Sequence, residues 1–130
     1  MIKLNHITIN VTNMQDSISF YSTFLNLSQN TTVDMGDSRI VYFSLPGDMQ
    51  LELIDTFQEN DCATTSQTAR GKYRHLAFEV DHLDDWYRKC LLLQIPVIMP
   101  PTILKPLQCI AMLIHDPNGV EIEFTEPLPQ

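Results

Sequence analysis

Basic residues are scarce in this sequence. The 130 residues include 8 Lys and Arg against 16 Asp and Glu, which gives a formal net charge of −8. Proteins that bind phosphate backbones or anionic membranes carry clustered Lys and Arg, so we expect neither nucleic acid nor a membrane as a partner. No apolar run approaches the roughly 20 residues that a membrane-spanning helix needs. The first eleven residues alternate polar and apolar side chains without a signal-peptide core, so we expect a cytoplasmic protein.

Cysteine is equally scarce. The three cysteines, Cys62, Cys90 and Cys109, are far apart and form no CxxC pair. An odd, widely spaced set favours reduced thiols in a reducing compartment over a disulfide framework or a cysteine metal site.

Apolar periodicity predicts two copies of the order β-α-β-β-β. The first copy comprises strands at 3–11, about 28–34, 39–45 and 49–55 and a helix at 13–25, with Thr12 as its N-cap. The second comprises a strand at 73–80, a helix with Asp81 as its N-cap, a short proline-interrupted strand, and strands at 107–115 and 119–125. The predicted fold class is therefore α+β, with two βαβββ modules. We expect one domain over 1–130, with module 1 at about 1–56, a linker at about 57–71 and module 2 at about 72–130.

The two predicted modules also repeat in sequence. The segment His6–Val11 (HITINV) recurs 69 residues later as HLAFEV, which begins at His75. Glu52 in LELI matches Glu123 in IEF. Each half thus opens with a histidine and closes with a glutamate.

These four residues share one sheet face in the prediction. Because strand side chains alternate, His6, Glu52, His75 and Glu123 all point away from the apolar positions that pack on the helices. If the sheets curl, that face lines a cup. Two imidazoles and two carboxylates there suit a divalent metal such as Zn, Ni, Co, Mn or Fe and leave positions open for water or substrate. Glu121 shares a face with Glu123, so it is expected at the rim of the cup or behind the ligands.

At these residues the sequence resembles the vicinal oxygen chelate superfamily, which includes glyoxalase I, bleomycin-resistance proteins, extradiol dioxygenases and fosfomycin-resistance enzymes. The matching pieces are HITINV, LELI, RHLAFEV and DPNGVEIEF. The resemblance is greatest to glyoxalase I-like members, whose His-Glu-His-Glu ligand set is filled by His6, Glu52, His75 and Glu123.

The resemblance implies a metal-dependent lyase or isomerase of the lactoylglutathione lyase type. Such an enzyme moves a proton through a metal-chelated enediolate, with Glu123 as the base and Glu52 as its counterpart. One divalent ion per chain (Ni, Co, Zn or Mn), a small substrate with vicinal oxygens and a homodimer with shared sites are also implied. The alternatives are a methylmalonyl-CoA epimerase-like or dioxygenase-like enzyme and a non-catalytic antibiotic-binding protein.

One position departs from the glyoxalase I pattern. Bacterial glyoxalase I typically has an Arg four residues after the first ligand histidine, where it helps to hold the glutathione carboxylates, and this chain has Asn10 there. The position four residues after Glu52 is Thr56. Arg70, Lys72 and Arg74 form a basic run before the strand at 73–80, and we weigh two interpretations of it: a replacement for the lost charge, or a solvated surface. The sequence therefore does not select one substrate.

Overall fold

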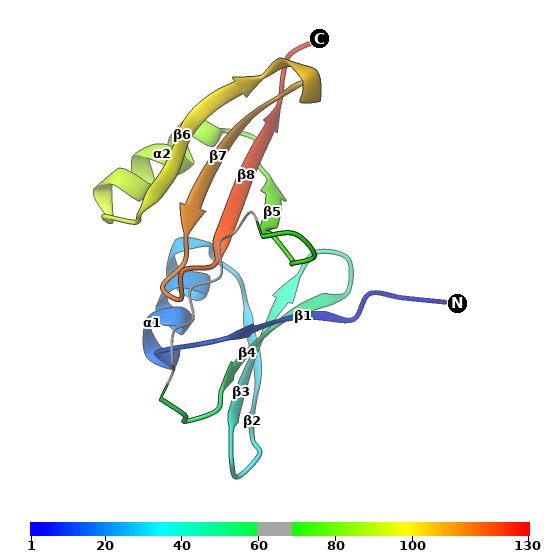
Figure 1. Cartoon of the computed structure of the whole chain (residues 1–130), viewed down its shortest axis with the longest axis vertical. Helices are drawn as coiled ribbons and strands as arrows, with labels where there is room; N and C mark the ends of the chain where they lie inside the picture. Colours follow the sequence, from blue (N-terminus) through cyan, green and yellow to red (C-terminus); the bar gives the residue numbers. More distant parts are fainter. Residues whose placement is uncertain (60–68) are drawn as a thin grey trace. The chain divides into compact units, whose positions relative to one another are not determined.

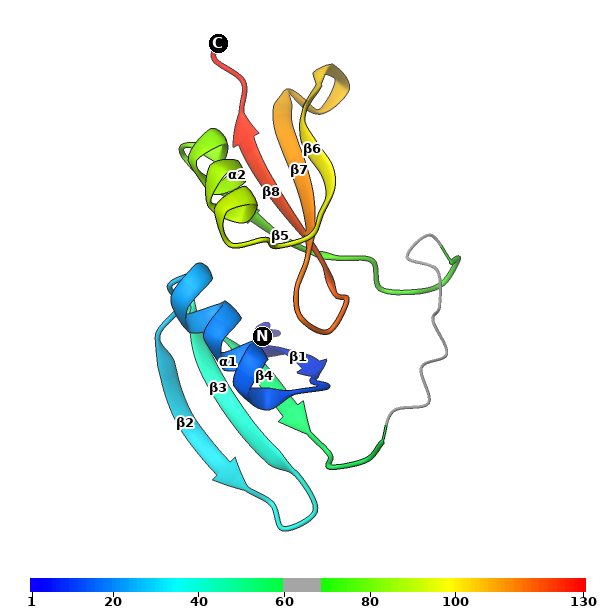
Figure 2. The ribbon, with the colours of Figure 1, turned by 90° about the vertical axis from the view of Figure 1, so that its left-hand side faces the viewer.

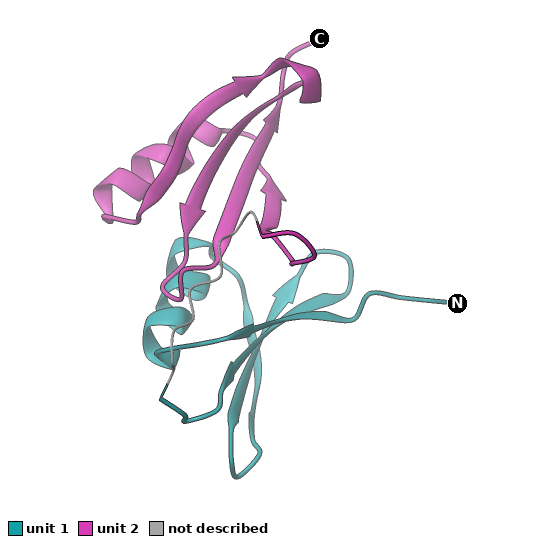
Figure 3. Cartoon of the chain, viewed as in Figure 1, with its two compact units in different colours: residues 1–62 teal, residues 63–130 magenta. Residues whose placement is uncertain are grey.

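The computed structural model describes residues 1–59 and 69–130. The chain divides into two compact units, Met1–Cys62 and Ala63–Gln130 (Figure 3). Most of the linker predicted at about 57–71 lies outside the described residues.

Unit 1 is a four-stranded sheet with one helical segment. Its elements are β1 (His6–Asn10), α1 (Met14–Ser19), a π-helical turn (Phe20–Phe24), β2 (Gln29–Asp34), β3 (Arg39–Leu45) and β4 (Met49–Asp55). The strand order is β1-β4-β3-β2, with β1 parallel to β4 and the other neighbours antiparallel. The first and last strands of the unit are therefore direct neighbours.

Unit 2 repeats this arrangement. It contains β5 (Leu76–Glu79), α2 (Leu83–Leu92), β6 (Val97–Leu104), a 3₁₀ turn (Lys105–Leu107), β7 (Cys109–His115) and β8 (Glu121–Pro127). The strand order is β5-β8-β7-β6, with β5 parallel to β8. Each curved sheet carries its helix on one face (Figures 1 and 2). The predicted α+β fold with two βαβββ modules is confirmed.

The core of each unit lies between the helix and the sheet. In β4, Leu51 and Leu53 are fully buried toward the helix, so Glu52 between them points to the opposite face. In β8, Ile122 and Phe124 are likewise buried on either side of Glu123. Trp86 of α2 stacks on Phe124 with 5.2 Å between ring centroids. The hydrophobic alternation thus directs the glutamates away from both helices, as predicted.

Both predicted helix caps are wrong by one residue. The N-cap of α1 is Asn13, whose Oδ1 accepts the backbone N–H of Asp16 at 3.0 Å, and not Thr12. Residue 82, and not Asp81, occupies the N-cap position of α2 and makes no side-chain capping bond. There the carboxylate of Glu126 on β8 accepts the N–H of Leu83 at 2.9 Å. A cap supplied by a distant strand leaves no local sequence signal.

Two other elements differ from the sequence prediction. The helix expected over 13–25 widens after Ser19, where the N–H of Leu25 donates to the carbonyl of Phe20, five residues back, at 3.1 Å. The proline-interrupted stretch forms the full strand β6, which tolerates Pro100 and Pro101 because it is an edge strand with register irregularities. Among the described residues, no helix is long and apolar enough to cross a membrane.

Candidate metal centre

The first His–Glu pair comes from the parallel neighbours β1 and β4. Register places His6 opposite Gln50 and Thr8 opposite Glu52, so the imidazole reaches diagonally along the sheet. His6 Nε2 lies 4.0 Å from Glu52 Oε1. The histidine side chain is 42% exposed and that of the glutamate 10% exposed, so the imidazole is accessible beside a shielded carboxylate.

Two hydroxyl groups hold Glu52. The Thr8 hydroxyl donates to Oε1 at 3.0 Å and the Tyr42 hydroxyl donates to Oε2 at 2.5 Å. Both residues are direct cross-strand neighbours of Glu52. The hydrogen bond to Glu52 raises the pKa of Tyr42 above its usual value, and burial and the carboxylate charge raise it further. Glu52 is therefore fixed by one hydrogen bond to each oxygen.

The second pair comes from the start of β5 and the middle of β8. His75 immediately precedes β5, and its Nε2 lies 3.7 Å from Glu123 Oε1. Register places Ala77 and Leu113 opposite Glu123, where unit 1 has Thr8 and Tyr42. Neither side chain offers a hydroxyl group. Glu123 is 21% exposed and lacks the restraints that hold Glu52.

A further carboxylate supports His75 from behind. Glu121 Oε2 lies 2.9 Å from His75 Nδ1 and 3.5 Å from Arg74 Nε, and its side chain is only 5% exposed. Of the two positions expected for Glu121, the structure shows the one behind His75 and not the rim. In unit 1 the corresponding nitrogen, His6 Nδ1, lies 2.7 Å from Asn5 Oδ1, a contact that sequence reasoning missed.

The turn before β8 sets the position of its glutamates. The buried carboxylate of Asp116 accepts the backbone N–H of Asn118 and of Val120, both at 2.8 Å. Gly119 adopts φ +81°, a conformation that glycine reaches without strain. This DPNG turn fixes the chain where it enters β8. The strand begins at Glu121, and Glu123 follows two residues later.

Each pair fits half of a metal site. Two ligand atoms on one divalent ion stand about 3.0–3.4 Å apart, given bonds of roughly 2.0–2.2 Å. The observed separations of 4.0 and 3.7 Å exceed the upper end of this range by about 0.6 and 0.3 Å, so each pair would have to move closer together to share one ion. Over residues 1–59 and 69–130, no group of three or more His, Cys, Asp or Glu side chains forms a metal site. Each unit by itself therefore offers a bidentate pair and not a complete coordination sphere.

A hollow of about 530 Å³ lies at the end of β1 and β4 in unit 1. It is lined by Asn10, Val11, Thr12, Thr56, Gln58 and Glu59. Asn10, which departs from the glyoxalase I pattern, and Thr56, four residues after Glu52, thus face one space. None of these described lining residues is a Lys or Arg, so the hollow offers hydrogen bonds and no positive charge to a ligand.

The family model of the Glyoxalase/Bleomycin resistance protein/Dioxygenase superfamily matches residues 3–124. The chain belongs to this superfamily. The predicted recognition is confirmed at the level of the superfamily, which contains many enzymes, often with divalent metals, and also non-catalytic small-molecule binders. No curated protein matches the chain.

Solved structures of the superfamily share the fold. A glyoxalase family protein from Enterococcus faecalis is 23% identical, with a TM-score of 0.80 over 95% of this chain and 97% of that one. An antibiotic binding protein from a Streptomyces species is 16% identical, with a TM-score of 0.74 over 98% and 97% of the two chains. A genomically encoded fosfomycin resistance protein from Listeria monocytogenes is 15% identical, with a TM-score of 0.72 over 97% and 93%. At these identities the likeness establishes the fold alone.

Proposed function

We propose that this protein is a divalent-metal-dependent lyase or isomerase of the glyoxalase I type. Its ligands are His6, Glu52, His75 and Glu123, and its substrate carries two neighbouring oxygens. The observation that carries the proposal is the duplication of one geometry: in both units an imidazole Nε2 lies within 4.0 Å of a carboxylate oxygen on the face opposite the helix. A paired imidazole and carboxylate suit Ni, Co, Zn or Mn.

The two glutamates have different roles in this proposal. A divalent ion held by these four residues would supply positive charge for two neighbouring substrate oxygens and for the negative charge that develops when the adjacent C–H loses its proton. Glu123 accepts that proton, because it is partly exposed and its direct strand neighbours, Ala77 and Leu113, leave its oxygens free to move. Glu52, held by Thr8 and Tyr42, remains a ligand and faces the substrate from the other side.

A complete site needs both pairs. We propose that the protein is a homodimer in which the His6–Glu52 pair of one chain meets the His75–Glu123 pair of another. The proposal is supported by the finding that each unit by itself brings together one imidazole and one carboxylate. A reducing, cytoplasmic location is also part of it, because Cys90 and Cys109 are free thiols.

The hollow beside β1 bears on the substrate. Lactoylglutathione carries carboxylates that a cationic side chain would hold, whereas Asn10, Thr56 and their neighbours provide neutral groups and one acid. This favours a substrate whose recognised end is neutral and polar over a glutathione conjugate. A metal-dependent epimerase acting on another acidic C–H, such as methylmalonyl-CoA, fits the same four ligands.

Metal content is the first test of the proposed function. Purified protein stripped of metal should bind about one Ni²⁺, Co²⁺, Zn²⁺ or Mn²⁺ per chain in calorimetric titrations. Glu52→Ala and His75→Ala should each lose binding or weaken it at least tenfold, whereas the matched control His82→Ala should bind like wild type. Unchanged stoichiometry and affinity in Glu52→Ala and His75→Ala would refute the ligand set. A screen of hemithioacetals, methylmalonyl-CoA and catechols with the loaded protein then identifies the reaction.

The second candidate is a non-catalytic binder of small molecules. It is favoured by the described hollow and by the fold shared with an antibiotic binding protein. A binder of this kind needs no ion, so metal-free protein should then bind an antibiotic with the same affinity as metal-loaded protein. A dioxygenase-like activity is the third alternative, and turnover of a catechol with uptake of oxygen would establish it.

A further inference from the structure

The proposed function does not use the buried carboxylate of Glu121. The Glu121 side chain is 5% exposed, and a carboxylate that has lost its water requires charged or hydrogen-bonding partners. Two partners are present, His75 at 2.9 Å and Arg74 at 3.5 Å. Arg74 Nε and His75 Nδ1 both approach the same oxygen of this carboxylate, Oε2, which can only accept hydrogen bonds when the group is ionised.

The acceptor determines which nitrogen of His75 carries the proton. An ionised carboxylate has no proton to donate, so a 2.9 Å contact with His75 Nδ1 requires that Nδ1–H be the donor. In the neutral ring, Nε2 then holds the lone pair. That nitrogen lies 3.7 Å from Glu123, on the side where the proposed ion would bind.

Unit 1 reaches the same ring orientation with other residues. Asn5 Oδ1 can only accept, so the 2.7 Å contact makes His6 Nδ1 the donor and leaves Nε2 directed at Glu52. Asn5 precedes His6 as Arg74 precedes His75, yet Asn5 contacts the imidazole directly and Arg74 contacts it through Glu121. Asn5 in unit 1 and Glu121 in unit 2 are different residues that give their histidines the same ring orientation. This agreement indicates that the orientation matters in both units.

We propose that Glu121 is the positioning residue of His75, which locks the imidazole in its Nδ1–H form and presents the Nε2 lone pair toward Glu123. Its significance for metal affinity rests on the proposed function, but the ring state itself does not. Histidine ligands commonly donate their second N–H to a carboxylate, and loss of such a partner lowers metal affinity roughly 10- to 100-fold.

The ring state can be measured without metal. Metal-free protein labelled with ¹⁵N-histidine gives two-bond ¹H–¹⁵N correlations that distinguish the two neutral forms, and the His75 signal is the one that His75→Asn removes. We expect the Nδ1–H pattern in wild type. Glu121→Gln keeps an acceptor oxygen and should retain that pattern. Glu121→Met has similar size and no comparable acceptor, so the ring should shift toward the Nε2–H form that free histidine favours in water.

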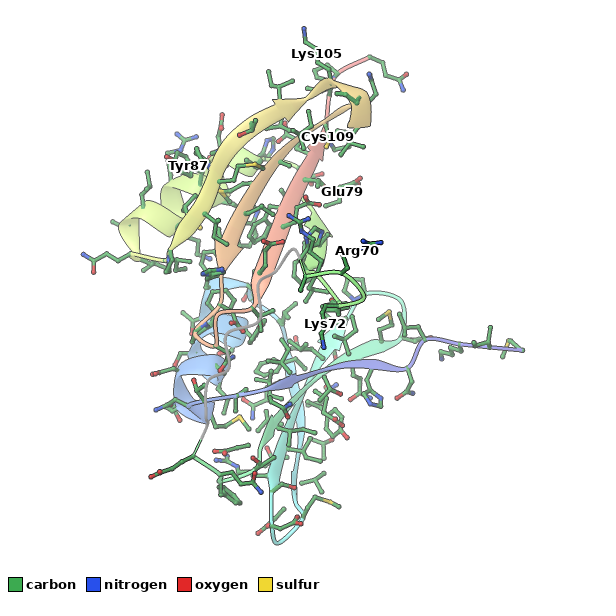
Figure 4. All side chains as sticks on the ribbon, in the orientation of Figure 1. Arg70, Lys72, Glu79, Tyr87, Lys105 and Cys109 are labelled. Carbon is green, nitrogen blue, oxygen red and sulfur yellow. The ribbon has the colours of Figure 1, made fainter. Side chains whose placement is uncertain are left out.

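Two controls separate positioning from general damage. Glu79→Ala removes an exposed carboxylate from β5, the strand that follows His75, and should leave the ring pattern unchanged (Figure 4). Arg74→Ala leaves Glu121 in place and should also retain the Nδ1–H form. Trp86 fluorescence, which reports on the α2–β8 packing, verifies that each variant is folded. If Glu121→Met does not fold, Glu121→Ala takes its place in the comparison.

An Nδ1–H pattern that persists in folded Glu121→Met or Glu121→Ala would overturn the proposal, as would an Nε2–H pattern in wild type. Zinc titration of the same proteins tests the link to metal. We expect affinity to fall at least tenfold in Glu121→Met and less than threefold in Glu121→Gln. If wild type binds no metal while Glu121 still sets the ring form, the proposed function fails and the positioning role of Glu121 stands.

Discussion

Tyr42 and Glu52 face each other across β3 and β4, and the Tyr42 hydroxyl donates to Glu52 Oε2 at 2.5 Å. The corresponding neighbours in unit 2 are Leu113 and Glu123, which form no such bond because leucine has no donor. The side chain of Glu52 is thus held by hydrogen bonds from its strand neighbours, whereas that of Glu123, at the matching position of the repeat, is not. This asymmetry and other described contacts lead to five predictions.

Tyr42→Phe removes one of the two hydroxyl groups that hold Glu52. We expect the free energy of unfolding of unit 1 to fall by about 1–2 kcal/mol, because the partly buried carboxylate loses a hydrogen-bond donor. Urea unfolding followed by circular dichroism measures the change. Tyr87→Phe on α2 is the matched control and should stay within about 0.5 kcal/mol of wild type. Equal stability of the Tyr42→Phe protein and wild type would mean that the bond contributes nothing.

Glu123→Gln should affect turnover more than metal binding. The amide can remain an oxygen ligand but cannot accept a proton, so kcat should fall by about 10²–10⁴-fold, the usual contribution of a general base. Glu52→Gln should mainly weaken metal binding, because the proposed function makes Glu52 a ligand and not the base. The check is a kcat measured at saturating metal for both variants. A kcat for Glu123→Gln within a few-fold of wild type would place the base elsewhere.

Mixing His6→Ala and His75→Ala chains tests the shared sites of the proposed homodimer. Neither variant alone has an intact set of four ligands. A heterodimer restores one of its two sites if the intact first half of one chain meets the intact second half of the other. Recovered metal binding is therefore expected after subunit exchange, with exchange confirmed by mass spectrometry of the native complex. Confirmed exchange without recovery would indicate sites built within single chains.

Cys90 gives the pH-dependent prediction. Burial raises the pKa of its thiol from 9.0 to about 11, an effect that the positive charge of Lys89 partly offsets. Because the folded-state pKa is the higher one, this contribution to stability is fully present below pH 9 and is lost as the pH rises through 11. The stability difference between wild type and Cys90→Ala should therefore shrink between pH 9 and pH 11. A difference that stays constant over this range would contradict the burial argument.

The same burial predicts an inert thiol. In a Cys62→Ser, Cys109→Ser protein, Cys90 should react with a disulfide reagent at pH 8 far more slowly than in the urea-unfolded chain, because little thiolate forms in the folded state. Equal rates would show that the thiol is accessible.

Sequence patterns predicted the element order and the faces because both depend on local alternation. Leu51, Glu52 and Leu53 determine which side of β4 is buried wherever the strand is placed. The same alternation directed His6 and Glu123 to the polar face. The structure places these residues on two units, and their joint binding of one ion stays a prediction.

Local sequence patterns could not predict the contacts that Glu121 makes with His75 and Glu126 with Leu83, because these contacts depend on strand register. His75 meets Glu121 only because β5 and β8 pair with Leu76 opposite Ile122. The α2 cap from Glu126 has the same origin, since that carboxylate lies 43 residues from the amide it accepts. The sequence repeat did contain one usable signal: Gln50 neighbours His6 in the register of unit 1, and its repeat partner is Glu121.

In each unit the first strand pairs with the last, so the histidine of each His–Glu pair is synthesised long before its glutamate. A ribosome that has released β1, β2 and β3 has made His6 without Glu52, and one that has stopped at the DPNG turn has made His75 without either of its carboxylates. The carboxylate of each His–Glu pair is thus synthesised after its histidine, with the last strand of the module. A single chain break at Pro117 would put Glu121 and Glu123 on one fragment and His75 on the other, so separation of the fragments would take both carboxylates from His75 together.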